Sequence, residues 1–310
     1  MLRIEYERYG TPEVMHLSAF NLPAPKEKEV LVRVRAAGLN PFDWKLRRGD
    51  LKIFTGSKLP RAMGSDFAGV VEAVGPNVTC FCVGDDVIGT VSPKASGAFA
   101  EKLITVEKLL VKKPPSMSFA QAATLPVAAV TAWQAIVDKA SVKSGQHVFL
   151  NGALGADGRA AIAIAQDLGA NVTGRVGKNA LEEARSLGLK TVLNYAKPIP
   201  SELQKTFDLV FDCNGSLSLQ ESAMLMKPGG MVIDIMPNGA KIINFLFRWH
   251  QKIIFANTEA KNLQKVVDFA AKDKLSIPIG RTAPLAEAIL MITEVEQGQR
   301  PKGKAVIVFD

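Results

Sequence analysis

Cysteine and long apolar runs are both scarce in this sequence. Three cysteines in 310 residues exclude a fold stapled by disulfides and are typical of a reducing compartment, so we expect a cytoplasmic protein. No uninterrupted apolar stretch reaches the ~18 residues that indicate a membrane helix. The nearest candidate, residues 120–137, contains Pro126 and several polar side chains. No basic and apolar leader precedes the strand-like residues 1–6, so we expect neither a membrane span nor a signal segment.

Basic residues outnumber acidic ones, and the formal net charge is +8. Lysine and arginine are nevertheless spread along the chain, with only short clusters such as residues 45–48 and 112–113. This spread is typical of a solvated surface and disfavours nucleic acid as a partner. Apolar residues make up 47% of the sequence, which indicates a large core, and the length suggests roughly two domains of about 150 residues.

The first third of the chain is rich in β patterns. Residues 1–115 contain short strand-like runs, such as the alternating residues 30–35, separated by Gly, Pro, Asn or Asp, which favours a small barrel or sandwich. The tail differs, because its apolar spacing predicts amphipathic helices over residues 263–270 and 285–292. A strand pattern follows at residues 304–309, and the pattern alone does not assign it to a domain.

From about residue 120, strand-like runs alternate with helical ones. The helical patterns cover residues 159–168 and 181–187, and this alternation predicts βαβ units with a parallel sheet. Six strands are typical of a doubly wound dinucleotide-binding sheet. The six candidates are residues 147–150, 171–173, 191–193, 208–211, 231–235 and 252–255.

The first strand of this region runs into a turn of small residues and then into an alanine-rich helix. Small residues allow the backbone to approach a pyrophosphate, and a helix N-terminus supplies free N–H groups and partial positive charge. A tight turn without any ligand has the same pattern. The prediction is a dinucleotide site formed by Gly152, Ala153, Gly155, Ala156 and Gly158.

The end of the next strand indicates which dinucleotide binds. A sheet built for NAD usually places Asp or Glu there, whereas an arginine accommodates the 2′-phosphate of NADP. This chain has Gly174 and Arg175 at that place, followed by Lys178. We therefore expect NADPH as the cofactor, with the alternative that Arg175 is an ordinary solvated charge.

Several ordered motifs point to one family. They are GLNPFDWK (38–45), GSDFAGVV (64–71), VGDDVIG (83–89), LPVAAVTAWQ (125–134) and KPGG (227–230). The chain resembles the zinc-free medium-chain dehydrogenases/reductases of the quinone oxidoreductase type. Through VIDIMP (232–237) and EAKNL (259–263) it is similar, within that family, to chloroplast-envelope quinone oxidoreductase homologues and their bacterial relatives.

The resemblance implies an α/β fold with two domains. A GroES-like β-barrel domain would comprise residues 1–121 and 259–310, and an inserted doubly wound Rossmann domain would comprise residues 122–258. Relatives of this kind form homodimers and bind NADPH between the domains. They reduce quinones or the C=C bond of α,β-unsaturated carbonyls, so we expect a quinone or enone as the small-molecule partner.

The resemblance also assigns roles to single residues. It places Asn40 and Thr131 at the nicotinamide, where they would position its C4 atom against an electrophilic carbon. It places Tyr195 beside the 2′-phosphate and Lys304 near the cofactor. Asn40 precedes Pro41, so it is alternatively a turn residue.

We expect no metal site. A catalytic zinc needs about three N, S or O ligands. Zinc-bearing relatives have Cys at the place of Asn40, His–Glu at the place of Ser65–Asp66, and in short members another Cys at the place of Val127. Cys80 and Cys82 are two residues apart, and we expect them to pack on one face of a strand.

One position departs from the family pattern. Relatives usually have Ala-Ser-Gly-Gly-Val-Gly in the phosphate turn, whereas residues 153–158 are ALGADG. Asp157 therefore brings a carboxylate to the expected pyrophosphate site, where it either competes with the phosphates for N–H groups or only caps the helix. This departure and the net charge leave an alternative function open, a non-catalytic NADPH- or RNA-binding crystallin-like protein.

Overall fold

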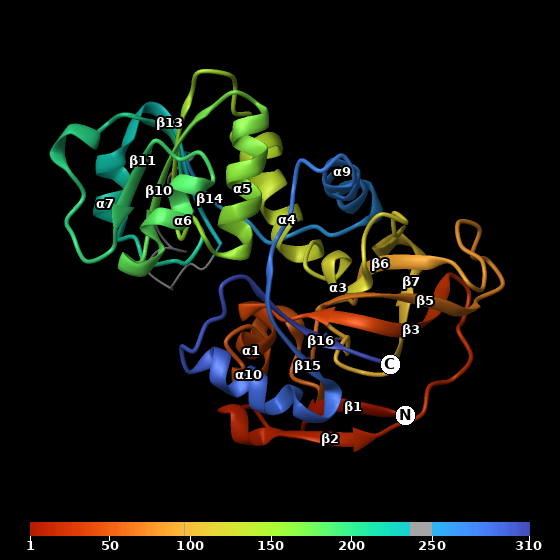
Figure 1. Cartoon of the computed structure of the whole chain (residues 1–310). Coiled ribbons are helices and arrows are strands. Elements are labelled where there is room, and N and C mark those ends of the chain that lie inside the picture. Colours follow the sequence, from red (N-terminus) through yellow and green to blue (C-terminus); the bar gives the residue numbers. More distant parts are fainter. Residues whose placement is uncertain (96, 236–249) are drawn as a thin grey trace. The chain divides into compact units, whose positions relative to one another are not determined.

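The computed structural model describes residues 1–95, 97–235 and 250–310, and the chain forms two compact units (Figure 1). The first unit contains Met1–Val127, Thr258–Ala271 and Ile277–Asp310, and the second contains Ala128–Asn257 and Lys272–Ser276. The first unit is therefore assembled from both ends of the sequence.

Strands dominate the first unit. They are β1 (Leu2–Tyr6), β2 (Met15–Ala19), β3 (Glu29–Gly38), β4 (Arg61–Ala62), β5 (Asp66–Val74), β6 (Asp86–Thr90), β7 (Lys102–Val106), β8 (Leu110–Lys112), β15 (Ile279–Pro284) and β16 (Lys304–Val308). One sheet has the order β2-β1-β4, and the other has the order β15-β16-β3-β5-β6-β8 with β7 paired to β3. The expected alternation in β3 is confirmed, because Val30, Val32 and Val34 are at most 1% exposed.

The helices of the first unit include both helices expected in the tail. They are α1 (Pro41–Arg48), α2 (Lys52–Thr55), α3 (Phe119–Ala122), α9 (Ala260–Ala271) and α10 (Ala288–Glu296), and α4 (Pro126–Trp133) leads into the second unit. The apolar residues that follow the predicted spacing are buried or partly buried, whereas Leu290 of α10, which lies outside that spacing, is 60% exposed. The expected last strand is β16, which pairs with β3 and so belongs to the first unit.

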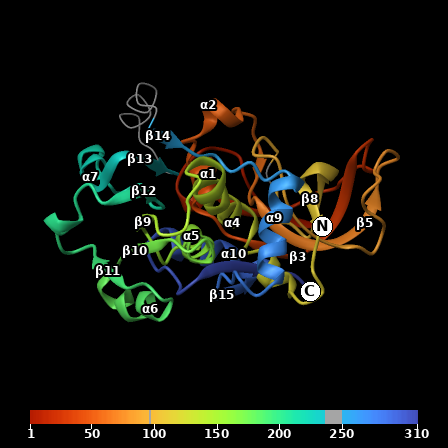
Figure 2. The same ribbon diagram turned by 90° about the horizontal axis from the view of Figure 1, so that it is seen from above.

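A parallel sheet forms the centre of the second unit. Its strands are β9 (His147–Asn151), β10 (Asn171–Val176), β11 (Thr191–Asn194), β12 (Phe207–Asp212), β13 (Met226–Asp234) and β14 (Gln251–Ile253). Their order is β11-β10-β9-β12-β13-β14 (Figure 2), and neighbouring strands are parallel. This confirms the predicted doubly wound sheet, whose strand order reverses between β9 and β12.

Helices connect the strands of this sheet. They are α5 (Ala156–Asp167), α6 (Leu181–Ser186) and α7 (Leu219–Leu225). Helix α5 packs on β9 and β10, and α7 packs on β12 and β13. Figure 1 shows α5 and α7 on opposite sides of the strands. Within the described ranges, no helix is both long enough and apolar enough to cross a membrane.

The expectation for Cys80 and Cys82 is wrong. Strand β5 ends at Val74, and both thiols are exposed in the loop that precedes β6. The backbone N–H groups of Cys80 and Cys82 donate to the carboxylates of Glu107 and Asp85. The loop is therefore held by carboxylates rather than by a neighbouring strand, and its cysteine side chains face solvent.

A buried ion pair joins α1 to α10 in the first unit. The Arg47 side chain is fully buried, and its Nη2 donates to both carboxylate oxygens of Glu296 at 2.7 and 2.8 Å. Arg48 adds a second guanidinium at 2.6 Å from the same carboxylate. Glu296, whose side chain is 2% exposed, thus compensates a charge that is held away from water.

Glu296→Gln should lower the free energy of unfolding by about 3–5 kcal/mol, because it leaves the buried guanidinium of Arg47 without a compensating charge. Glu294→Gln is the control on the same helix. The Glu294 carboxylate pairs with Arg281 where both side chains are partly exposed, so the loss should stay under about 1 kcal/mol. Urea denaturation followed by circular dichroism compares the two variants, and equal losses would contradict the assignment.

Candidate functional site

The small-residue turn between β9 and α5 has the conformation that its sequence requires. Gly152 has φ +91°, a left-handed conformation that favours glycine. A Cβ atom at Gly158 would collide with the carbonyl oxygens of Gly152 and Ala153. Helix α5 follows at once, with Gly155 at its N-cap and Ala156 as its first residue. The turn can therefore expose backbone to a phosphate group, and its role in binding a dinucleotide remains a prediction.

Asp157 lies in the first turn of α5 and is half-buried. Burial raises the pKa of the Cys213 thiol, and the negative charges of Asp157, Asp212 and Asp234 raise it further. Because Cys213 follows β12 directly, the Asp157 carboxylate lies close to the point where the strand order reverses. This is the place at which open α/β sheets bind ligands.

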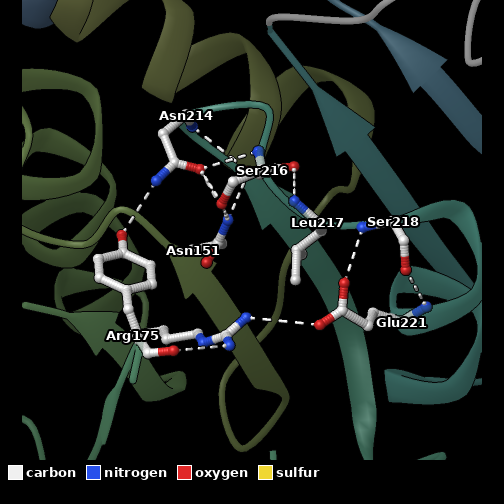
Figure 3. Close-up of polar contacts among 9 residues, drawn as sticks. Asn151, Arg175, Asn214, Ser216, Leu217, Ser218 and Glu221 are labelled. Carbon is white, nitrogen blue, oxygen red and sulfur yellow. Dashed lines mark hydrogen bonds and ion pairs between the residues drawn. The ribbon is translucent and has the colours of Figure 1, made fainter. Parts of the chain in front are cut away.

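Arg175 near the end of β10 is enclosed but loosely bonded. Its side chain is 11% exposed, and one terminal nitrogen lies 3.7 Å from the carboxylate of Glu221 on α7 (Figure 3). The other donates to the carbonyl oxygen of Tyr195 at 3.4 Å, and the guanidinium lies 5.5 Å from the centre of the Tyr195 ring. Its Nε is buried and has no hydrogen-bond partner among the residues that the structure describes. The sequence did not indicate the contact with Glu221, because only the strand order brings α7 toward β10.

The residues expected beside Arg175 differ in their surroundings. The Tyr195 hydroxyl accepts from Asn214 Nδ2 at 3.1 Å, and burial raises the pKa of Tyr195 to about 12. Lys178 is exposed. Gly174 is buried, and a Cβ there would meet Leu189 and Ala153 at 2.8 and 2.9 Å. The glycine at 174 therefore has a packing reason that is independent of any cofactor.

A buried amide network that sequence reasoning missed connects β9 to the loop after β12. Asn151 is fully buried, and its Nδ2 lies 2.7 Å from Asp212 Oδ1, 2.8 Å from Asn214 Oδ1 and 2.9 Å from Ser216 Oγ. Figure 3 shows Asn151, Asn214 and Ser216 converging. The Asp212 carboxylate also accepts from the N–H groups of Gly215 and Leu217, each at 2.9 Å. The loop that leads to α7 and Glu221 is thus fixed in place.

Asn40 lies in the first unit, immediately before α1. Its backbone N–H donates to Asp43 Oδ2 at 2.8 Å, and Ser65 Oγ donates to Asp43 Oδ1 at 2.6 Å. Burial raises the pKa of Asp43 to about 7. Asn40 is therefore a helix-start residue, as the sequence allowed. Its buried Nδ2 has no hydrogen-bond partner, so a donor is also available for a carbonyl group.

Lys304 forms a buried ion pair in the same unit. Its Nζ donates to Asp66 Oδ2 at 2.9 Å and to the Thr124 carbonyl oxygen at 3.0 Å, and the side chains of Lys304 and Asp66 are 3% and 0% exposed. The N–H of Val127 approaches both oxygens of Asp66 at 3.3 Å. The ammonium group is therefore already engaged, and its role near a cofactor remains a prediction.

The expected partner of Asn40, Thr131, belongs to α4 and is 4% exposed. Asn40 and Thr131 lie in different units, so their joint role at a nicotinamide also remains a prediction. As for metals, the described residues contain no group of three or more His, Cys, Asp or Glu side chains that could hold an ion.

Two family models match the sequence. The model of the alcohol dehydrogenase GroES-like domain matches residues 26–115, within the first unit. The model called zinc-binding dehydrogenase matches residues 187–307. Together with the observed sheets, these matches confirm the expected fold class, a GroES-like domain combined with a Rossmann-like parallel sheet.

Curated relatives and solved structures agree with these models. The chloroplastic quinone-oxidoreductase homolog of Spinacia oleracea is 31% identical over 307 residues, which cover 93% of this chain and 92% of that protein. The chloroplastic NADPH-dependent alkenal/one oxidoreductase of Arabidopsis thaliana is 36% identical over 237 residues, 74% of this chain and 60% of that protein. The structure of the quinone oxidoreductase from Coxiella burnetii has a TM-score of 0.88 at 28% identity and covers 100% of this chain and 99% of its own. The chain thus belongs to the quinone oxidoreductase family of medium-chain dehydrogenases/reductases and is an oxidoreductase.

Proposed function

We propose that this oxidoreductase uses NADPH to reduce quinones or the C=C bond of α,β-unsaturated carbonyls, and that it works without zinc. The observation that carries the proposal is the enclosed and incompletely paired guanidinium of Arg175. Arg175 lies on β10, the strand next to the one that leads into the phosphate-type turn. Buried donors without partners are costly, and a 2′-phosphate would satisfy this one. The names of the relatives support both substrate classes. Homodimer formation and a cytoplasmic location remain expectations.

The residues of this chain fit an NADPH molecule in three places. The turn of Gly152, Ala153, Gly155, Ala156 and Gly158 would take the pyrophosphate. Arg175, Lys178 and Tyr195 would surround the 2′-phosphate. Asn40 would donate from its Nδ2 to the nicotinamide carboxamide, Thr131 would help to position the nicotinamide, and Lys304 would lie near the cofactor. When bound, NADPH supplies a hydride from C4, and the protein contributes mainly binding and orientation.

The same residues do not fit a catalytic zinc ion. Asn40 and Ser65 are poor substitutes for the Cys and His ligands of zinc sites. Asp66, the remaining carboxylate, already has a buried cation in the ammonium group of Lys304. A zinc ion there would have to displace that ammonium group and would gain few ligands in return.

The first test is an assay of the purified protein. NADPH should be consumed in the presence of a quinone or an enone, the metal content should be well below one zinc per chain, and chelators should leave the rate unchanged. About one zinc per chain, lost together with activity on chelation, contradicts the zinc-free mechanism. Binding of NADPH without turnover of any quinone or enone would instead favour the alternative, a non-catalytic binding protein, which Asp157 in the phosphate turn keeps open.

Arg175→Ala should weaken NADPH binding and leave NADH binding nearly unchanged. The 2′-phosphate is the only group that distinguishes the two cofactors, and charge-assisted hydrogen bonds are worth roughly 1.5–3 kcal/mol, which corresponds to about 10–150-fold in Kd. Arg185→Ala, which removes an exposed arginine from α6, is the control. Calorimetric titration measures all four affinities, and equal losses for both cofactors would refute the assignment of Arg175.

Asp157→Val should tighten both cofactors equally, by a few-fold at low salt, because the pyrophosphate that its carboxylate repels is common to both. Asp167→Val, at the opposite end of α5, removes the same charge and should have little effect. Titrations at low and high salt separate electrostatic repulsion from other causes. If the Asp157 variant binds neither cofactor more tightly at low salt, the carboxylate does not compete with the pyrophosphate and only caps α5.

A further inference from the structure

We propose that Glu221 is a specificity-determining residue of the cofactor site, which holds Arg175 in the cofactor-free protein and thereby lowers the preference for NADPH over NADH. This inference rests on the proposed function, because it concerns the recognition of a ribose 2′-phosphate. The inference adds a residue from α7 to the proposed site residues in the phosphate turn and at the end of β10. Glu221 would act through the guanidinium of Arg175.

The two carboxylate oxygens of Glu221 have different contacts. Oε2 accepts from the backbone N–H of Ser218 at 2.8 Å, and the N–H of Glu221 donates to Ser218 Oγ at 3.0 Å, which together form a capping box at the start of α7. Oε1 faces the guanidinium of Arg175 at 3.7 Å. Figure 3 shows this division, with Glu221 between Ser218 and Arg175. The capping box therefore fixes the carboxylate in a position where its second oxygen acts on Arg175.

The contacts of Arg175 are loose enough to exchange. Its polar contacts lie at 3.4 and 3.7 Å, longer than the ~2.7–2.9 Å of a well-made charge-assisted hydrogen bond. Its buried Nε has no partner. A phosphate group carries more charge than a carboxylate and offers three acceptor oxygens, so it can replace Glu221 and also engage the unpartnered donor. Breaking the contact between Arg175 and Glu221 costs free energy, and only the 2′-phosphate requires it to break, so the contact opposes NADPH and not NADH.

Among the residues that the structure describes, none other offers Arg175 a strong polar partner. The Tyr195 ring covers the guanidinium, and the Tyr195 hydroxyl is directed to Asn214. The loop between β12 and α7 is fixed by the Asn151 amide and the Asp212 carboxylate, so Glu221 is presented by a well-bonded segment. Its own side chain is 40% exposed, so solvent and salt weaken its attraction for Arg175.

Glu221→Gln removes the charge while keeping an oxygen for the Ser218 N–H, since glutamine also closes a capping box. We expect NADPH to bind about 3–10-fold more tightly and NADH to change by less than about twofold, with the gain shrinking at high salt. The same comparison with adenosine 2′,5′-bisphosphate against adenosine 5′-monophosphate isolates the nucleotide end. Glu182→Gln, an exposed glutamate on α6, is the matched control and should change neither affinity.

Two further results decide between Glu221 and other causes. In an Arg175→Ala background the gain in NADPH affinity from Glu221→Gln should fall below about twofold. A full gain there would contradict the inference that Glu221 acts through Arg175. In the protein that retains Arg175, equal tightening of NADPH and NADH by Glu221→Gln, or no tightening of either, would overturn the inference. If the unaltered protein binds neither cofactor, the proposed function itself has failed, so the two failures are distinguishable.

Discussion

A charged side chain that is taken out of water needs a partner of opposite charge, and the enclosed cations of this chain meet that need to different degrees. Arg47 is bonded to Glu296 at 2.7–2.8 Å and Lys304 to Asp66 at 2.9 Å. Among the described residues, Arg175 has only longer contacts and one buried donor without a hydrogen-bond partner. The first two cations therefore hold elements of the first unit together, whereas Arg175 has the most of these three to gain from an external anion.

The buried polar groups around Asn40 show how a family site can be organised by hydrogen bonds. The Asp43 carboxyl group receives the hydroxyl of Ser65 and the N–H of Asn40, and the pKa of this carboxyl group, raised to about 7 by burial, allows its neutral form near neutral pH. The nearby Asp66 pairs with the ammonium group of Lys304 at 2.9 Å. Each buried carboxyl group is thus compensated, Asp43 by hydrogen bonds and Asp66 by an ammonium group. Under the proposed function, the Asn40 side chain would bind the cofactor.

Periodicity predicted much of the fold because each signal was local. The six strands of the parallel sheet, the helices α9 and α10 and the strand β16 follow from patterns within a few residues. The errors arose where a contact depends on distant segments. Cys80 and Cys82 were expected to pack on one face of a strand, but they lie in a loop that is held by the carboxylate of Glu107, from a distant segment, and by that of Asp85 within the loop. Gly174 was linked to cofactor choice, and the structure adds a packing reason, since Leu189 and Ala153 leave no room for a Cβ.

The candidate site was predicted in part for the same reason. The phosphate turn and Arg175 carry local signals, whereas Glu221 reaches Arg175 only because β10, β9 and β12 are neighbours in the sheet. Its capping box with Ser218 begins α7, and nothing in the sequence showed which cation its second oxygen faces. The Asn151 network was missed because a buried asparagine at a strand end has no distinctive pattern of its own.

The two carboxylates at the proposed cofactor site, Asp157 and Glu221, would act on different quantities. The pyrophosphate is common to NADPH and NADH, so a charge beside it changes overall affinity, whereas a charge beside the 2′-phosphate changes the choice between them. Neither phosphate group changes during hydride transfer, and contacts that are equal in the ground and transition states alter KM rather than kcat. Both residues would therefore set how much of the cofactor is bound and which one, whereas under the proposed function the chemical step would depend on the groups near Asn40.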